Sequence, residues 1–261
     1  MTVFVEDFGA FGDGVRGDTA AIELAIDAAL NVPMNPLNAV ALLFFKQKDN
    51  LIFLGSTFSF RESSYFLTAE HCLTNKSEKD IVVVSPTDNI VRSVLKIIRH
   101  PSADIALLLV DVPSNNQVES FWDCVGNYSL GEEYVAFGYP EDSIGPNEGK
   151  PTPRLFKGYY QRFMDHNSHM GYSYYAGELN IPCPGGLSGG PIFRPRAPMM
   201  LTGIATEGIE AATLLDSQEV ILHDGKVHHD HYRSVVNYGI SLLLYPIKSW
   251  LDEHVPLRKR A

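Results

Sequence analysis

The stretch PGGLSGGP at residues 184–191 places one serine, Ser188, in a turn built from glycine and proline. Glycine adopts the backbone conformations that tight turns need, and Gly186 lets backbone N–H groups face a developing negative charge. A serine hydroxyl is a poor nucleophile until a neighbouring base takes its proton. The turn therefore predicts a nucleophile only if the rest of the chain supplies that base.

Two earlier stretches supply a candidate base and a group to orient it. The strand-like run FLTAEHC at residues 66–72 ends near His71, and Asp104 begins the apolar run DIALLLV at residues 104–110. A histidine base needs a third group that fixes its tautomer and stabilises the imidazolium. Singly, the histidine is typical of a strand end and the aspartate of a turn. Together with Ser188 they predict a hydrolytic centre.

Composition describes an ordinary globular chain and disfavours several functions. The 261 residues are 45% hydrophobic and 20% charged, which is ample apolar material for a core. Lys and Arg number 21 against 31 Asp and Glu, a net charge of −10 that disfavours a general nucleic-acid binder. The apolar runs are far shorter than the roughly 18 residues that a membrane helix needs. We expect neither a nucleic-acid nor a membrane partner.

The cysteines and the first residues predict a cytoplasmic protein. Residues 1–7 have no basic start and no long apolar stretch, so we expect no secretory signal. Cys72, Cys124 and Cys183 are an odd number, widely spaced and without a CxxC pair. This pattern disfavours a disulfide framework and a structural zinc site. We expect reduced thiols and neither a metal nor an organic cofactor.

Short strand patterns fill most of the chain. Runs of β-branched and aromatic residues alternate with polar turns rather than with helical patterns, which disfavours a parallel α/β sheet. The predicted strands cover residues 38–45, 51–60, 65–68, 81–85, 91–99, 105–110, 134–138, 154–163, 171–178, 190–193, 200–206 and 235–244. We predict an all-β fold of two antiparallel β-barrels, the first over about 36–125 and the second over about 126–244.

A helix is expected at each end of the chain. The first covers residues 20–30 within an N-terminal arm of residues 1–35, because prolines after it disfavour further helix. The second covers residues 245–255 and closes the main domain of residues 36–261. The apolar face of this closing helix comprises Ile247, Trp250 and Leu251.

The three stretches resemble the active-site blocks of the trypsin-like, chymotrypsin-fold serine peptidases. The strand-Thr-Ala-x-His-Cys block contains His71, the Asp-Ile-Ala-Leu block contains Asp104 and the Gly-x-Ser-Gly-Gly-Pro block contains Ser188, in the family's order. LTGIATEG at residues 201–208 resembles the family's strand beside the substrate. The resemblance spans roughly residues 39–253. It implies a serine endopeptidase of the bacterial, cytoplasmic type without disulfides.

This resemblance implies a role for each matched residue. Ser188 is the nucleophile, His71 the general base and then acid, and Asp104 the residue that orients His71. Backbone N–H groups of Gly186 and Ser188 form the oxyanion hole. A polypeptide substrate would be hydrolysed through an acyl-enzyme on Ser188.

The resemblance also implies a substrate-binding strand. Thr206, Glu207 and Gly208 would offer main chain to an extended peptide, and Thr206 matches a position whose hydroxyl supports the aspartate. Pro182 matches the base of the specificity pocket, so a preference for Lys or Arg is not supported. Glu207 lies at the mouth of that pocket, where we expect a solvated charge.

Two departures from the secreted members are informative, and the first agrees with the cytoplasmic prediction. Leu54 stands where the disulfide partner of Cys72 would be. Leu187 replaces the aspartate that binds a newly cut N-terminus in zymogen-activated members. We therefore expect no such activation step.

Residues 3–29 resemble the start of pectate-lyase-like β-helix proteins, including phage tail spikes. The resemblance rests on VEDFGAFGDG at residues 5–14 and DTAAI at residues 18–22. A β-helix needs many stacked coils, and the rest of the chain follows the peptidase pattern, so we infer no polysaccharide activity. The arm is instead a candidate docking segment for a protein partner.

Other interpretations fit parts of the pattern. A catalytically silent peptidase-fold scaffold and an esterase-type acyl hydrolase remain alternatives. The GxSxG pattern at residues 186–190 also occurs in α/β-hydrolases, but there it leads into a helix, whereas a strand pattern follows here. His228, His229 and His231 match no closed zinc pattern and are expected in a solvent-exposed loop.

Overall fold

A computed structural model describes residues 36–48, 50–112, 129–144, 151–195, 200–221 and 227–255, with backbone only for 36–37, 212–221 and 227–233. The predicted helix at residues 20–30 and Cys124 lie outside these ranges. Within the described ranges, no helix is long and apolar enough to cross a membrane.

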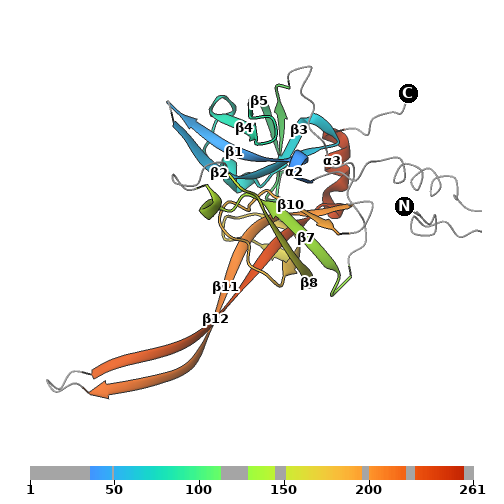
Figure 1. Cartoon of the computed structure of the whole chain (residues 1–261). Coiled ribbons are helices and arrows are strands. Elements are labelled where there is room, and N and C mark those ends of the chain that lie inside the picture. The colour runs from blue at the N-terminus through green and yellow to red at the C-terminus, as the bar shows by residue number, and fades with distance from the viewer. Residues whose placement is uncertain are drawn as a thin grey trace, which may run out of the picture.

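Six antiparallel strands close the first barrel in the order β1-β2-β3-β6-β5-β4 (Figure 1). Its strands are β1 (Val40–Gln47), β2 (Asn50–Phe60), β3 (Glu62–Thr68), β4 (Ile81–Ser85), β5 (Ile90–Arg99) and β6 (Ala106–Val110). A short helix α2 (Pro36–Ala39) precedes β1, and the 3-10 helices η2 (Glu70–Leu73) and η3 (Glu78–Asp80) connect β3 to β4. Apolar, β-branched residues form these strands because they pack well on a half-buried pleated surface.

Six further strands close a second barrel in the order β10-β11-β12-β9-β8-β7. They are β7 (Glu133–Gly138), β8 (Arg154–Asn167), β9 (Ser173–Leu179), β10 (Pro191–Arg194), β11 (Met200–Ile221) and β12 (Val227–Leu243), with the 3-10 helix η4 (Glu141–Ser143) after β7. The prediction of an all-β fold with two antiparallel barrels is confirmed.

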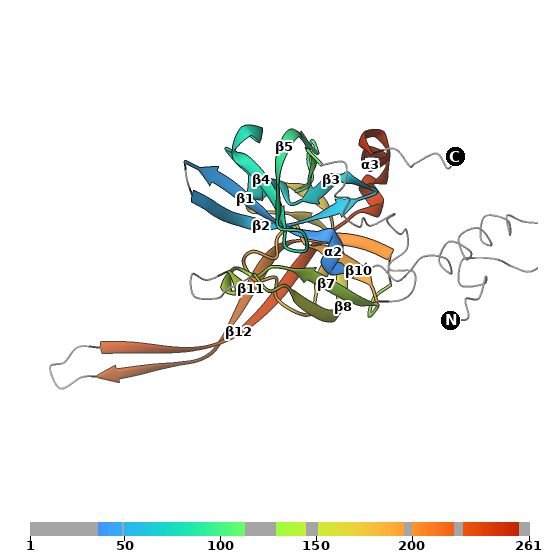
Figure 2. The same ribbon diagram turned by 45° about the horizontal axis from the view of Figure 1, so that its top comes forward.

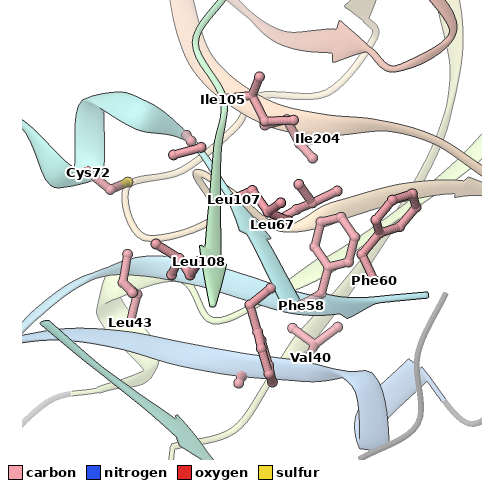
Figure 3. Packing of buried hydrophobic residues seen from close by; sticks show 14 of the residues in the cluster. Val40, Leu43, Phe58, Phe60, Leu67, Cys72, Ile105, Leu107, Leu108 and Ile204 are labelled. Atoms are coloured by element: carbon pink, nitrogen blue, oxygen red, sulfur yellow. The ribbon is translucent and has the colours of Figure 1, made fainter. Parts of the chain in front are cut away.

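The largest hydrophobic cluster spans both barrels. It joins residues of the first barrel, such as Phe58 and Leu107, to Ile204 of β11 and Leu242 of β12, all of them almost fully buried. Figure 3 shows Ile204 beside Ile105 among the side chains of the first barrel. Because apolar burial is the main favourable term in folding, this shared cluster fixes the two barrels against each other and so positions whatever lies between them.

Strands β11 and β12 continue past the barrel as a long hairpin, hereafter the β11–β12 arm (Figures 1 and 2). Their ladder runs out to the pair Ile221↔Val227, whereas the sequence predicted strands only over 200–206 and 235–244. The additional residues mix polar and apolar types without strict alternation. A two-stranded ribbon held by its own ladder needs no buried face, so it leaves little of the apolar alternation on which strand prediction depends.

The histidine-rich run belongs to this arm. His228, His229 and His231 lie in β12 and pair in register with β11. The expectation of a loop is therefore wrong, for the same reason: the run has no apolar period to mark it as a strand.

The chain closes with a helix on the first barrel. The 3-10 helix η5 (Tyr245–Ile247) and helix α3 (Lys248–His254) follow β12, which confirms a closing helix at the predicted place. Leu251 is fully buried in the shared cluster. Arg61, between β2 and β3, donates hydrogen bonds to the carbonyl oxygen of Val255 and to the carboxylate of Asp252. The end of the second half of the chain is thus bound to the first barrel.

Candidate active site

His71 and Asp104 form a pair within the first barrel. His71 lies in η2, directly after β3, and Asp104 lies in the bend before β6. The carboxylate accepts hydrogen bonds from both ends of the histidine, at 2.9 Å from the backbone N to Oδ1 and 2.7 Å from Nδ1 to Oδ2. Asp104 is only 3% exposed. This bidentate contact fixes the ring orientation and leaves Nε2 as the nitrogen able to take a proton.

The environment of His71 pulls its pKa in two directions. Burial, the largest single influence, lowers the pKa of the imidazole, but the hydrogen bonds and charge interactions with Asp104 and Cys72 together outweigh burial and raise the pKa above the ordinary 6.5. The carboxylate therefore stabilises the imidazolium, which is the charged form that a general base produces when it takes a proton.

Ser188 lies in a turn that requires glycine on both sides. Gly186 and Gly189 have φ angles of +86° and +83°, in the left-handed region that favours glycine. A Cβ on Gly186 would lie 2.6 Å from Tyr139 O, and one on Gly189 would lie 2.2 Å from Ser56 O. Both distances are below any real contact, so the turn packs directly against backbone.

The turn presents two unused N–H groups. The Gly185 carbonyl accepts a hydrogen bond from Glu141 N at 2.7 Å, which fixes the peptide group that precedes Gly186. Neither Gly186 N nor Ser188 N donates a hydrogen bond to any residue that the structure describes. Adjacent free N–H groups beside a serine are the arrangement that stabilises an oxyanion.

Ser56 connects this turn to the first barrel, and sequence analysis missed it. This fully buried serine of β2 donates from Oγ to Gly186 O at 2.8 Å, accepts from Tyr139 N at 2.9 Å, and donates from its backbone N to Ser188 O at 2.9 Å. A polar residue inside an apolar strand was the available signal. Its partners are about 80 to 130 residues away in sequence, so no local pattern could identify them.

Small residues bring the two halves of the site together. A Cβ on Gly55 would meet Ser188 O at 2.8 Å and Cys72 Sγ at 3.0 Å. A Cβ on Gly189 would likewise lie only 2.9 Å from Ala69 N. The serine turn of the second barrel therefore packs against the segment that contains His71.

Ser188 is not hydrogen-bonded to His71 in this structure. Ser188 Oγ donates to Thr206 O at 3.0 Å, and no hydrogen bond between Ser188 and His71 occurs among the described residues. Catalytic hydrogen bonds are often loose in unliganded sites and tighten only when substrate binds. The structure thus shows a formed His71–Asp104 pair beside a serine with a different partner.

Comparison with known proteins identifies the family. The trypsin-like peptidase domain family matches residues 55–197, which is more than half of the chain. The chain belongs to this family. The match includes His71, Asp104 and Ser188 and excludes residues 3–29, for which no comparison supports the pectate-lyase-like resemblance. A search of curated proteins gave no match.

Solved structures share the fold of this trypsin-like peptidase domain at low sequence identity. The MamO protease domain from Magnetospirillum magneticum has a TM-score of 0.56 at 18% identity, covering 82% of this chain and 95% of that one. The Rv3671c protease from M. tuberculosis, active form, has a TM-score of 0.58 at 13% identity, covering 93% and 88%. An HtrA-type protease, AlgW, with a tripeptide has a TM-score of 0.55 at 16% identity, covering 84% and 61%.

In this peptidase domain the hydroxyl of Thr206 bonds to other partners than Asp104, the residue that the resemblance implied it would support. Thr206 Oγ1 donates to Ile240 O at 3.0 Å and accepts from Tyr174 Oη at 3.0 Å. No hydrogen bond to Asp104 occurs among the described residues. Burial raises the pKa of the Tyr174 phenol, with a further contribution from the nearby charge of Asp104. Tyr174, which the sequence did not indicate, thus lies between the strand and the buried carboxylate.

Glu207 is not the solvated charge that we expected. Its carboxylate contacts His166 Nε2 of β8 and His169 Nδ1, the latter at 3.1 Å, and its side chain is 16% exposed. Both histidines lie at the β8–β9 turn, which approaches β11 only in the folded chain, so sequence spacing could not pair them.

The same turn also contacts the first barrel. Tyr172 Oη donates to the carboxylate of Glu70, which also accepts from Arg99 Nε at 2.9 Å. Ser173 N donates to Ser102 O at 2.9 Å. Glu70 directly precedes His71, so this turn buttresses the segment that contains the candidate base.

The predicted base of the specificity pocket is placed differently. Pro182 is exposed, and the neighbouring Cys183 points inward, with Sγ 4.0 Å from Ile240 O. The residue of β2 that faces Cys72 is Gly55, and not Leu54, which the resemblance had placed opposite this cysteine. The ladder explains the offset, because Gly55 and Phe53 pair with consecutive residues of β1 and Leu54 is left as a bulge.

A metal site does not emerge from the parts of the chain that the structure describes. No group of three or more His, Cys, Asp or Glu side chains in those ranges is arranged to hold an ion. Cys72 and Cys183 are free thiols.

Proposed function

We propose that this peptidase is a serine endopeptidase in which Ser188, His71 and Asp104 form the catalytic triad. The observation that carries the proposal is the bidentate contact of the buried Asp104 with His71, at 2.7 and 2.9 Å, beside a serine turn with two free N–H groups. The family match supports peptide hydrolysis. The domain proposed for it covers residues 36–261.

In this mechanism each residue acts on a stated atom. His71 Nε2 takes the proton from Ser188 Oγ as the oxygen attacks the substrate carbonyl, and Asp104 stabilises the resulting imidazolium. The N–H groups of Gly186 and Ser188 hold the oxyanion. His71 then gives its proton to the leaving amine, and water activated by the same nitrogen hydrolyses the acyl-enzyme.

Substrate binding supplies the missing step. The carbonyl of Thr206 is the present acceptor of the Ser188 hydroxyl. Residues 206–208 are proposed to pair with an extended peptide, whose N–H would take Thr206 O. The hydroxyl loses that acceptor and turns to His71.

A catalytically silent scaffold is the second candidate function. The hydrogen bond from Ser188 to Thr206, instead of to His71, is the observation that favours it. A silent protein would keep this bond in the presence of peptide.

Labelling with a fluorophosphonate probe tests the proposal, with Ser188→Ala as the matched control. We expect the wild type to react at Ser188 and the variant not to react. Equal labelling of both proteins would refute the assignment of the nucleophile. Labelling of neither would favour the silent scaffold. Cleavage of peptides, rather than of small esters alone, distinguishes the endopeptidase from an acyl hydrolase.

We propose further that the protein works with reduced thiols in the cytoplasm. Cys72 and Cys183 are free, and both are shielded from solvent to some extent. Alkylation of protein from freshly lysed cells tests this, because a disulfide recovered there would contradict it. The N-terminal arm of residues 1–35 stays a candidate docking segment for a protein partner.

A further inference from the structure

The gap beside Ser188 decides which residue a substrate can place before the scissile bond. This inference rests on the proposed function, in which residues 206–208 bind the peptide. Ser188 Oγ lies 3.0 Å from Thr206 O, so β11 borders the nucleophile. The side chain of the attacked residue would enter between β11 and the segment 181–187 that leads to the serine. The width of that gap sets the side chains that the site admits.

The gap is closed at Gly208. A methyl group built on Gly208 would lie 3.0 Å from Cys183 O, below the ordinary separation of non-bonded atoms. The backbone of Cys183 therefore rests on β11. No side chain of a substrate fits between these two segments as they stand.

The inner part of the gap is filled by a thiol. Gly208 pairs with Gly239 of β12, and this glycine pair leaves a recess that neither of the two residues fills with a side chain of its own. A methyl group on Gly239 would meet both Cys183 Sγ and Ile181 O at 2.7 Å. Burial raises the pKa of the Cys183 thiol to about 12, so the sulfur is a neutral, compact filling group. The protein's own cysteine occupies the space that a substrate side chain would need.

The carboxylate of Glu207 offers no alternative anchor in the gap. Glu207 is the acidic residue at its mouth, and His166 and His169 already engage its carboxylate. A basic substrate side chain would have to displace both histidines to reach it. Shape, rather than charge, is therefore the feature by which this gap selects a substrate.

We propose that Cys183 is a specificity-determining residue and that the peptidase cleaves after glycine or alanine. The hydrogen of glycine or the methyl of alanine can stay at the mouth of the gap. A larger side chain must enter the recess that Cys183 fills. The substrate class is thus a polypeptide segment with a small residue before the scissile bond.

A peptide library tests this proposal. The wild-type protein is incubated with peptides that vary only at Gly, Ala, Val, Leu, Phe or Lys before the scissile bond, within randomised flanks, and products are identified by mass spectrometry. Since one methylene in a tight pocket changes kcat/KM by about 10- to 200-fold, we expect a drop of at least about tenfold from Ala to Val and a larger one to Leu, Phe and Lys.

Fluorophosphonate labelling in parallel separates a failure of the proposed specificity from a failure of the proposed endopeptidase activity. Efficient cleavage after Leu, Phe or Lys by a protein that labels at Ser188 overturns the specificity and leaves the endopeptidase in place. A protein that neither labels nor cleaves removes the endopeptidase, and the specificity falls with it.

Two opposed variants sharpen the test. Cys183→Gly removes the thiol, so the backbone at residue 183 gains room to move away from Gly208 into the recess, and we expect the ratio of kcat/KM for Val over Ala to rise about tenfold. Gly208→Ala places a methyl against Cys183 O, and we expect the preference to move from Ala toward Gly. Thermal unfolding shows whether each variant is folded. Equal losses on all peptides, with unchanged ratios, would overturn the role of Cys183; if Cys183→Gly does not fold, Gly208→Ala and the wild-type series decide.

Discussion

The two barrels differ in whether their candidate site residues already form the hydrogen bonds that the proposed mechanism needs. In the first barrel, His71 is bound at two atoms by the nearly buried carboxylate of Asp104. In the second, the hydroxyl of Ser188 donates to Thr206 O, and the N–H groups beside it are unused within the described residues. The base lies in a hydrogen-bonded pair that one barrel completes by itself. In the proposed mechanism, Ser188 depends on a third component, the substrate, to change its hydrogen-bond partner.

The largest expected effect comes from removing the nucleophile. Ser188→Ala should lower kcat/KM for a peptide by about four to six orders of magnitude. The His71–Asp104 pair has no hydrogen bond to Ser188 within the described residues, so the variant should unfold at nearly the wild-type temperature. Peptide hydrolysis and thermal unfolding measure the two parts. Retained turnover in this variant would contradict the mechanism.

Asp104→Asn disrupts the His71–Asp104 pair of the first barrel, and we expect kcat to fall about 10⁴-fold. Asparagine cannot stabilise the imidazolium, and burial then lowers the pKa of His71. The acid limb of the kcat/KM profile should therefore lie above pH 6.5 in the wild type and shift to lower pH in the variant. An unshifted limb would show that Asp104 does not set this pKa.

The same pair predicts how stability varies with pH. A histidine whose pKa is raised by folding stabilises the protein fully below its ordinary 6.5. That stabilisation is lost as the pH rises through the folded-state pKa. Thermal unfolding of the wild type should show this decline, and Asp104→Asn should lack it. Parallel profiles for the two proteins would contradict the prediction.

Ser56→Ala tests the junction between the halves. It removes the hydrogen bonds to Gly186 O and from Tyr139 N, and leaving buried partners unsatisfied costs about 1–3 kcal/mol each. We expect kcat to fall about 10- to 100-fold with little change in KM, because the serine positions the turn without contacting the peptide. Ser56→Thr retains a hydroxyl and serves as the comparison. A change confined to KM would argue against a positioning role.

Cys72→Ser should have the smallest effect on activity. Cys72 is a free thiol, 5% exposed, packed in the shared core, so the polar hydroxyl should lower stability by about 1 kcal/mol. Turnover should persist under reducing conditions. A large loss of activity at unchanged stability would assign the thiol, which interacts with the His71 side chain, a role in the reaction.

The difference between the halves also marks what the sequence could predict. His71, Asp104 and Ser188 each lie in a short sequence motif formed by adjacent residues. These motifs and most strands can therefore be recognised from the sequence alone. Glu207 with His166, and Ser56 with Gly186, are contacts between residues about 40 and 130 positions apart. Their side chains carry no periodic signal, because folding rather than local pattern brings them together.

Cys183 illustrates the same limit. The resemblance directs attention to Pro182, one residue away, whereas the sulfur is placed by the glycine pair at 208 and 239. The β11–β12 arm was missed for a related reason, since its residues do not alternate strictly between polar and apolar and its ladder forms only in the folded chain. Sequence analysis therefore predicts the chemistry of this site better than its shape.

The anchoring of α3 limits how the site can open. After β12 the chain returns to the first barrel, where Arg61 binds Val255 and Asp252, and the rings of Trp250 and His100 stack edge-on with centroids 5.2 Å apart. The barrels are thus joined by the connection between them, by the shared core and by this returning end. Two bodies tied at separate points cannot swing apart about a single hinge. The barrels therefore act as a fixed frame, and adjustment of the site on substrate binding is confined to local segments such as β11 or the β8–β9 turn.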